Sequence, residues 1–258
     1  MKARIRLFPL LLLLLLTAYA FNGCVTGGVR GALRVSGAHT TVKAEATTQE
    51  AAYDLYLRGL IFIAGDDVTL TVKPADGAAR VEIDCPKALV TKYGLTATID
   101  SGEIRIEADS LYTLRTDSFH VTVYAPCKSV FVEGAYDLDI DASGVDEFSL
   151  KISGAAEGGV KNIKASEVNC DVAGAANISL AGSADNLTCR INGAGDINAK
   201  DLTARDATLQ INGAGEITAT ATTSLDAAIN GAGKIGYYGR PADVRQQLAG
   251  AGSIEPLD

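Results

Sequence analysis

The sequence predicts an all-β protein, a parallel β-helix built of coils of roughly 19–20 residues, with irregular coils towards its N-terminus. Three observations predict this fold. A glycine recurs about every twenty residues, aliphatic residues alternate with polar ones before each of these glycines, and a further aliphatic position follows at a fixed distance.

The recurring glycine marks a sharp corner of the chain. The segment Ile-Asn-Gly-Ala-Gly occurs three times, at 191–195, 211–215 and 229–233. Such a corner needs backbone dihedral angles that glycine adopts at little cost. The first glycine of the segment belongs to a column whose members follow one another at intervals of 18 to 20 residues: Gly134, Gly154, Gly174, Gly193, Gly213, Gly231 and Gly250.

Strands are predicted on both sides of this corner. The position two residues before the glycine is always aliphatic: Val132, Ile152, Val172, Ile191, Ile211, Ile229 and Leu248. The position four residues after it is aliphatic except at Gly158: Leu138, Ile178, Ile197, Ile217, Ile235 and Ile254. Coils in the same phase would stack about 4.8 Å apart and bury one continuous aliphatic core.

Two other folds share part of this pattern. An antiparallel meander would show the same alternation, but reversing every strand would scramble columns of identical residues. A leucine-rich repeat has a similar period but needs a Leu-x-x-Leu-x-Leu pattern with an Asn or Cys ladder, which the sequence lacks. The constant period and phase therefore favour parallel coils.

Residues 30–128 also contain predicted strands, in a looser pattern. Apolar segments such as 68–72 and 121–123 are separated by turn signals such as Pro74-Ala75-Asp76-Gly77. We expect this part to form the irregular first coils, which close one end of the stack.

Regular glycine-phased coils are expected over residues 129–258. At their far end, Tyr237–Pro241 and Pro256 could blunt the exposed strand edges, because proline cannot donate a backbone hydrogen bond. No linker-like stretch divides the chain, so residues 25–258 are predicted to form a single domain.

Residues 1–24 are predicted to be an export signal. A basic start precedes seven consecutive leucines, Leu10–Leu16, a stretch too short to span a bilayer as a helix. Phe21-Asn22-Gly23-Cys24 resembles a bacterial lipobox, which predicts lipidation of Cys24 and a lipid anchor in the outer membrane. The alternative is cleavage after Ala20 by ordinary signal peptidase, which would leave a periplasmic or secreted protein.

Charge and histidine content exclude two classes of function. The net charge of −8 argues against a nucleic-acid partner, because affinity for nucleic acid is mostly cationic. The only histidines are His39 and His120, and no Cys-x-x-Cys pair occurs, so we expect no zinc site. His120 lies on the outward phase of a strand and is expected to face solvent.

Four cysteines follow Cys24, and they are too few for a disulfide framework: Cys85, Cys127, Cys170 and Cys189. Cys170 and Cys189 share one inward column on adjacent coils. Their Cα atoms would lie within disulfide range, but side chains that point the same way fit the disulfide torsion poorly. We therefore expect two buried free thiols there, and Cys85 and Cys127 fall outside the regular phase.

The repeated Ile/Leu-x-Ile-Asn-Gly-Ala-Gly-x-Ile unit and the segment Tyr237–Glu255 resemble the "putative auto-transporter adhesin, head GIN domain" family of Bacteroidetes envelope proteins. The resemblance covers nearly the whole chain after the export signal, although the early coils around 132–160 depart from the motif. It implies a β-helix, right-handed, on an exported or lipid-anchored protein. It implies no established reaction.

The strongest candidate for a metal or catalytic site is a polar column three residues past the corner glycine: Asp137, Glu157, Asn177, Asp196, Glu216, Lys234 and Ser253. Adjacent coils would place Asp196 and Glu216 about 5 Å apart, near enough for a metal ion or a carboxylate pair. Lys234 and Ser253 in the same column favour a solvated corner instead. We expect Asn192, Asn212 and Asn230 to form a structural ladder of stacked amides.

The repeated strands account for most of the sequence, and no motif brings catalytic residue types together in one cluster. The sequence therefore predicts a non-catalytic cell-envelope protein, an adhesin or binding scaffold that presents its flat faces to a glycan or protein partner and needs no cofactor. The alternative is a carbohydrate-active enzyme of the polysaccharide lyase kind, since right-handed β-helices host pectin-cleaving enzymes that work with a calcium-binding acidic groove.

Overall fold

The computed structural model describes residues 33–59, 67–75, 77–109 and 114–257. The chain separates into two units, Met1–Gly31 and Ala32–Asp258, and the described residues all belong to the second. The predicted export signal at 1–24, including Cys24, lies outside the described residues.

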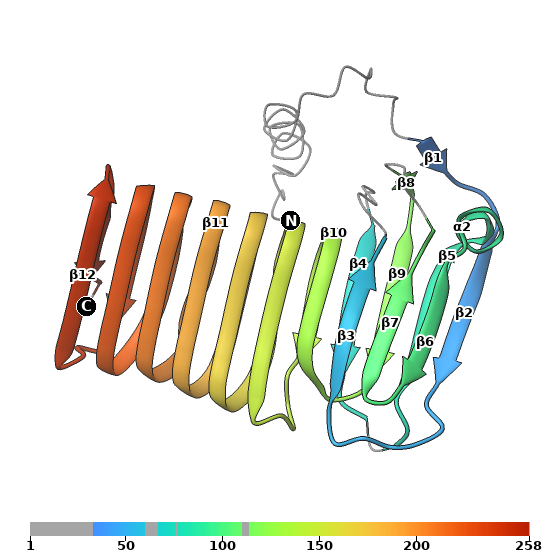
Figure 1. Cartoon of the computed structure of the whole chain (residues 1–258), viewed down its shortest axis with the longest axis horizontal. Coiled ribbons are helices and arrows are strands. Elements are labelled where there is room, and N and C mark those ends of the chain that lie inside the picture. Colours follow the sequence, from blue (N-terminus) through green and yellow to red (C-terminus); the bar gives the residue numbers. More distant parts are fainter. Residues whose placement is uncertain (1–32, 60–66, 76, 110–113, 258) are drawn as a thin grey trace, which may run out of the picture. The chain divides into compact units, whose positions relative to one another are not determined.

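The described part of the chain is all-β with one short helix (Figure 1). In chain order its elements are β1 (Leu33–Val35), β2 (His39–Glu45), β3 (Tyr53–Arg58), β4 (Val68–Lys73), β5 (Arg80–Pro86), α2 (Lys87–Tyr93), β6 (Thr96–Asp100), β7 (Glu103–Glu107), β8 (Leu114–Thr116), β9 (Phe119–Tyr124), β10 (Cys127–Asp141), β11 (Glu147–Tyr238), β12 (Asp243–Gly250) and β13 (Ser253–Pro256). Apart from a small parallel pair of β1 with β8, the strands join one 11-stranded sheet.

The long strand β10 folds this sheet back on itself. Its first half pairs with β3, so that Val130 lies beside Leu55, and its second half pairs with β4, so that Ile140 lies beside Val72. Along its whole length β10 also pairs with the first part of β11. Two walls of sheet therefore face each other across the core.

The predicted parallel β-helix is wrong as the fold class. The structure is a nearly closed, barrel-like sheet of mixed parallel and antiparallel strands. β2 pairs antiparallel with β5, β5 with β9, and β6 with β7.

The physical reason for this difference is that alternation specifies which face of a strand is buried and leaves its direction open. Strands β6 and β7 are joined by Ser101 and Gly102, whose φ angles are +50° and +77°. Two central residues with positive φ are typical of a tight hairpin turn, which forces an antiparallel pair. Asp100-Ser101-Gly102 is also a turn signal in the sequence, but no glycine column in this region indicates the strand directions.

From β10 to the C-terminal strands, neighbouring passes of the chain pair in parallel, one repeat apart. Val132 lies beside Ile152 and Gly134 beside Gly154 at the start of this region. At its end Gly231 lies beside Gly250 and Ile235 beside Ile254. We call one such pass a rung, and β11 contains several successive rungs (Figure 1).

The corner glycines stack directly over one another. Gly213 has a φ of +139°, and a Cβ atom added there would lie 2.3 Å from the carbonyl oxygen of Gly193. A side chain is therefore excluded both by the dihedral angle and by the backbone of the previous rung. The predicted corner is confirmed.

Aliphatic columns fill the space between the two walls. Ile191, Ile211 and Ile229 are at most 1% exposed, as expected from their common position before the corner. Ile235, in the column after the corner, is 0% exposed. The same columns open to solvent on the last rung, where Leu248 is 52% exposed.

A short helix that the sequence analysis did not predict follows β5. Helix α2 begins after Pro86, buries Leu89 and Tyr93, and ends at Gly94 in the left-handed conformation. Glycine is the usual residue at such a helix end because it adopts this conformation without strain. Among the described residues, no helix has the length and apolar content needed to cross a membrane.

Tyr136 occupies the inward position two residues after the corner, where later rungs have alanine or glycine. Its ring packs edge-on against Phe119, with the ring centroids 6.4 Å apart, and it is 1% exposed. Its hydroxyl finds no hydrogen-bond partner within the described residues, and burial raises the pKa of this phenol far above its usual range. The large side chain fills the core at the cost of an unsatisfied polar group.

We expect Tyr136→Phe to raise the free energy of unfolding by about 1 kcal/mol, because it removes a buried hydroxyl without changing the shape of the ring. Tyr53→Phe is the matched control. The Tyr53 hydroxyl accepts a hydrogen bond from the Glu50 backbone N–H at 3.0 Å and donates one to the Thr48 carbonyl at 3.3 Å. Its loss should lower stability by about 1 kcal/mol. Urea unfolding measures both, and equal effects of the same sign would contradict this assignment.

Candidate functional site

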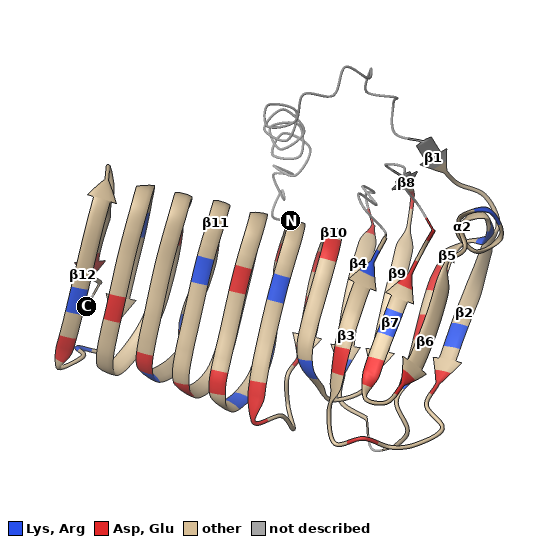
Figure 2. Ribbon diagram, in the orientation of Figure 1, with Lys and Arg blue, Asp and Glu red and all other residues tan. Residues whose placement is uncertain are grey.

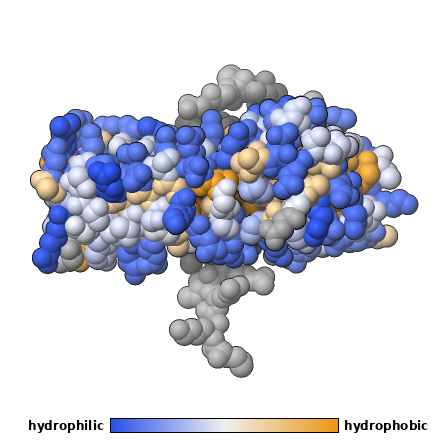
Figure 3. All heavy atoms as spheres, turned by 90° about the horizontal axis from the view of Figure 1, so that it is seen from below, coloured by the Kyte–Doolittle hydropathy of each residue, from blue (hydrophilic) through white to orange (hydrophobic). Residues whose placement is uncertain are grey.

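The described surface is mainly polar. Figure 2 shows acidic residues recurring near the lower ends of several rungs of β11. Figure 3 shows a face on which hydrophilic side chains predominate and apolar ones occupy small areas between them. Such a surface suits a polar ligand better than a broad apolar one.

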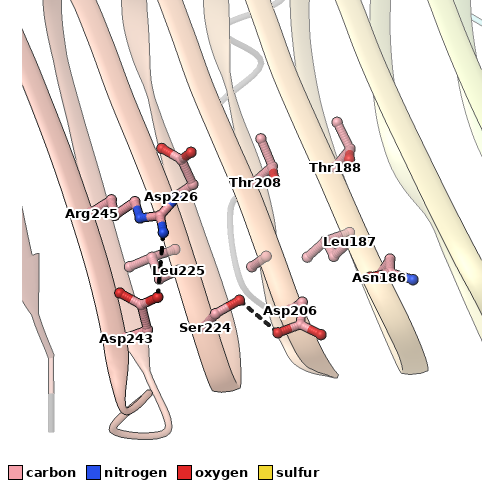
Figure 4. Close-up of a pocket in the computed structure, with 11 residues that line it drawn as sticks. Asn186, Leu187, Thr188, Asp206, Thr208, Ser224, Leu225, Asp226, Asp243 and Arg245 are labelled. Carbon is pink, nitrogen blue, oxygen red and sulfur yellow. Dashed lines mark hydrogen bonds and ion pairs between the residues drawn. The ribbon is translucent and has the colours of Figure 1, made fainter.

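A pocket with a volume of about 290 Å³ crosses four neighbouring rungs near the C-terminal end (Figure 4). We call it the four-rung pocket. It is lined by Asn186, Leu187, Thr188, Asp206, Ala207, Thr208, Ser224, Leu225, Asp226, Asp243 and Arg245.

The repeat itself positions these side chains. The position six residues before each corner glycine points inward, as Leu187, Ala207 and Leu225 do. Its two neighbours on each rung therefore point outward. They form two polar rows across the rungs, Asn186, Asp206, Ser224 and Asp243 in one and Thr188, Thr208, Asp226 and Arg245 in the other.

Carboxylates dominate the charge of the four-rung pocket. The Ser224 hydroxyl donates a hydrogen bond to Asp206 Oδ1 at 2.6 Å. Arg245 Nη2 lies 3.8 Å from Asp243 Oδ2, so the one cation of the lining is already paired. Asp226 has no ion-pair partner in the described part of the chain. The lining carries three carboxylates against one guanidinium, so it attracts hydroxyl, amide or cationic groups and repels anions.

The predicted carboxylate pair lies outside the four-rung pocket. Asp196 and Glu216 are exposed on adjacent rungs, and Asp196 Oδ1 accepts a hydrogen bond from the Glu216 backbone N–H at 3.1 Å. On the next rungs Lys234 Nζ lies 2.7 Å from Glu255 Oε1, and the hydrogen bond to Glu255 raises the pKa of Lys234. Among the described residues, no group of three or more His, Cys, Asp or Glu side chains is placed to hold a metal ion.

The predicted amide ladder is confirmed. Asn212 Nδ2 donates to Asn192 Oδ1 at 2.9 Å, and Asn230 Nδ2 donates to Asn212 Oδ1 at 3.1 Å. Each amide thus satisfies the next along the stack, which supports the structural interpretation of these residues. His120 lies on the outward phase with its side chain 35% exposed, and its Nδ1 is 3.0 Å from Thr69 Oγ1.

A second group of residues was missed in the sequence. Tyr56 and Phe131 lie side by side on the outer face of β3 and β10, with ring centroids 6.4 Å apart. The guanidinium carbon of Arg58 is 4.8 Å from the Tyr56 centroid and 5.4 Å from that of Phe131, and Lys151 also approaches Phe131. The available signal was two aromatic residues on the polar phase of their strands. Because Arg58 already covers both rings, this group is a cation–π cluster that stabilises the surface.

The described cysteines are free and buried, as expected for Cys170 and Cys189. Burial raises the pKa of Cys127 and of Cys170 to about 12, from an ordinary value of 9.0. Burial also raises the pKa of Cys189 well above that value. A buried thiol of this kind is neither a good nucleophile nor a ready metal ligand.

We expect these thiols to resist iodoacetamide at pH 8 in the folded protein and to react when urea unfolds it, with mass spectrometry locating the label. The raised pKa values also affect stability. The unfolded chain ionises its thiols near pH 9, so their contribution to stability is present below that pH and is lost as the pH rises towards about 12. Labelling of Cys170 at the same rate in both states would contradict its burial.

Comparisons with known proteins agree with this architecture. The sequence profile of the family "Putative auto-transporter adhesin, head GIN domain" matches residues 61–241. No curated protein is similar in sequence to the chain.

Three solved structures resemble the fold. A "putative adhesin" from Bacteroides fragilis has a TM-score of 0.69 at 20% identity, over 88% of this chain and 100% of its own. A "putative lipid binding protein" from Parabacteroides distasonis has a TM-score of 0.55 at 21% identity, over 88% and 100%. A "putative adhesin" from Parabacteroides merdae has a TM-score of 0.55 at 17% identity, over 88% and 99%.

At these identities the structural likeness concerns the fold alone, whereas the family match is made on the sequence itself and spans more than half of the chain. Within the matched residues lie the corner glycine of β10, the five corner glycines of β11 and most of the four-rung pocket: Gly134, Gly154, Gly174, Gly193, Gly213 and Gly231, with Asn186 to Asp226. The chain belongs to the family described as "Putative auto-transporter adhesin, head GIN domain".

Proposed function

We propose that this protein is a non-catalytic, adhesin-like binding protein of the cell envelope, and that its four-rung pocket binds a neutral or amino-containing glycan. The observation that carries the proposal is the double row of hydroxyl, amide and carboxylate groups repeated over four rungs. A ligand built of repeated polyhydroxylated units can pair with a polar surface that itself repeats.

The charge of the pocket separates this proposal from the alternative of a polysaccharide lyase. A lyase of the pectin-cleaving kind acts on a polyuronate, which is an anion at every sugar. Asp206, Asp226 and Asp243 would repel such a chain, and the only cation of the lining, Arg245, is paired with Asp243. Binding without cleavage is therefore the function that the pocket supports best.

The proposal is tested on a glycan array that carries neutral, amino-containing, uronic and sulfated glycans. Binding to neutral or amino-containing glycans is expected, and Asp206→Asn with Asp226→Asn should weaken it by about tenfold or more, because hydrogen bonds to charged groups are the stronger ones. Asp196→Asn is the matched control, since Asp196 is an exposed aspartate on the same stretch of rungs but outside the pocket.

Three results would overturn the proposal. The first is binding confined to uronic or sulfated glycans. The second is binding that Asp196→Asn weakens as much as the pocket variants do. The third is the release of unsaturated products from a polyuronate incubated with the protein and calcium, which would establish the lyase instead.

We further propose that residues 1–24 export the chain and that a lipid on Cys24 anchors it in the outer membrane. The basic start, the leucine run and the lipobox-like Phe21–Cys24 support this. Mass spectrometry of the membrane fraction should find an acylated Cys24, and Cys24→Ser should move the protein to the soluble fraction. An unmodified N-terminus at Phe21 would show cleavage after Ala20 instead.

A further inference from the structure

Strand β12 is an open edge of the sheet. It pairs with β11 on one side, and among the described strands it has no partner on the other. Figure 1 shows it as the outermost strand at this end. Every residue of Asp243–Gly250 is exposed. Unpaired N–H and C=O groups along such an edge are a template for pairing with another strand.

Apolar side chains lie on this edge as well. Val244 is 38% exposed and Leu248 is 52% exposed, and they are the exposed large hydrophobic residues of the described part of the chain. Their partners on the previous rung, Leu225 and Ile229, are 2% and 1% exposed. On the last rung, therefore, the side chains at the core positions are exposed to solvent because no further rung covers them.

The backbone of β12 directs alternate residues to the open side. Ala251 N–H donates to the Gly231 carbonyl oxygen at 2.9 Å, in register with the pair of Gly231 and Gly250, so it points towards β11. N–H groups alternate between the two sides of a strand. Counting back along the strand, the N–H groups of Val244, Gln246 and Leu248 consequently point away from β11, to the open side.

These features fit a second copy of the same strand. In an antiparallel pair centred on Gln246, this residue lies opposite Gln246 of the other copy, and the two exchange both backbone hydrogen bonds. Val244 then lies opposite Leu248, and this apolar contact forms twice across the two-fold axis. A pair centred on Arg245 would instead place two arginines opposite each other, which is unfavourable.

The edge lacks the usual protection against such pairing. Asp243–Gly250 contains neither proline nor lysine, whereas Pro256 interrupts the neighbouring edge strand β13. Pro241, which was expected to blunt this end, lies before β12 begins. The protected strand is thus β13, and β12 is left able to pair.

We propose that two copies of this chain associate end to end through β12, in an antiparallel, two-fold symmetric strand pair centred on Gln246. The pairing continues the sheet from one copy into the other and covers Val244 and Leu248 of both. Because Asp243 and Arg245 also line the four-rung pocket, the two pockets are brought close to each other. Two linked sites raise the apparent affinity for any repeated ligand, and the association itself requires no ligand.

A cysteine cross-link tests the register. In the proposed pair the Gln246 Cα atoms are about 5.5 Å apart, within disulfide range, and the Gln247 Cα atoms are about 9 Å apart. Mild oxidation of the full chain carrying Gln246→Cys should give a covalent dimer, with a peptide joining residue 246 of both copies. Gln247→Cys is the matched control and should not. Equal cross-linking of the two variants would overturn the proposed register.

Analytical ultracentrifugation of the unmodified full chain measures the association itself. We expect a monomer–dimer equilibrium, and we expect Leu248→Lys to raise its dissociation constant by about 100-fold, since it places a charge in an apolar contact that forms twice. Ala232→Lys adds the same charge at an exposed corner one rung away and should leave the equilibrium unchanged. A monomer at about 100 μM, well above micromolar dissociation constants, or a mass larger than a dimer, would overturn the proposal.

Glycan binding by a strictly monomeric protein would leave the proposed function intact and refute this association alone.

Discussion

Gly213→Ala is expected to lower the free energy of unfolding by about 2–6 kcal/mol, a loss large enough to unfold much of the chain at physiological temperature. Gly213 has a φ of +139°, and its added Cβ would lie 2.3 Å from the carbonyl oxygen of Gly193. The crowding continues on the next rung, where a Cβ on Gly231 would lie 2.2 Å from the Gly213 oxygen. The corner cannot move away, because shifting it would break the parallel hydrogen bonds on both sides.

The neighbouring residue supplies the control for this prediction. Ala214 occupies the same corner but is exposed, so Ala214→Ser should change stability by less than about 0.5 kcal/mol. Thermal and urea unfolding followed by circular dichroism measure both variants. If Gly213→Ala unfolded at the same urea concentration as Ala214→Ser, the close stacking of the corners would be refuted.

Ile229→Ala is expected to cost about 2–5 kcal/mol, because it opens a cavity in a core that the rungs share. Ile229 is 1% exposed and lies beside Leu248 on the last rung, which is 52% exposed. The two residues occupy the same position of the repeat and differ in whether another rung covers them. Leu248→Ala should therefore cost less than about 1 kcal/mol in the monomer, since little of its apolar surface leaves water on folding.

Urea unfolding at protein concentrations too low for association compares these two variants. The difference between them measures what one covering rung contributes to burial. Similar losses for Ile229→Ala and Leu248→Ala would mean that the end of the stack is covered in solution by part of the chain itself.

The stacked part of the fold could be predicted because its signal is periodic. One glycine column at 18–20-residue intervals gave the corner at Gly213, and the aliphatic columns gave the buried positions of Ile211 and Ile235. The N-terminal strands offered alternation without a column. Alternation leaves strand direction open, so the antiparallel pairs of β2 with β5 and of β6 with β7 were missed, and helix α2 is too short to show helical periodicity.

The four-rung pocket could not be predicted for a different reason. Its residues are 18 to 20 positions apart and are unremarkable singly, since Thr208 and Ser224 are common surface residues. They become neighbours only when the offset between rungs is known. The column three residues after the corner glycine suggested Asp196 and Glu216 as a site, but the same column contains Lys234, which pairs with Glu255. A column of charged residues therefore predicts a site only when the ion pairs that its members form on adjacent rungs are known.

The four-rung pocket, the amide ladder and the open edge all require that successive rungs lie in register, corner over corner. Spin labels at Ser153 and Asn230, both exposed and both one residue before a corner glycine, measure this directly when labelled protein is diluted with unlabelled protein. Four rung spacings separate them, so the account predicts a narrow distance distribution at about 15–25 Å by pulsed electron paramagnetic resonance. A broad distribution, or one centred beyond about 35 Å, would contradict the stacking of the rungs.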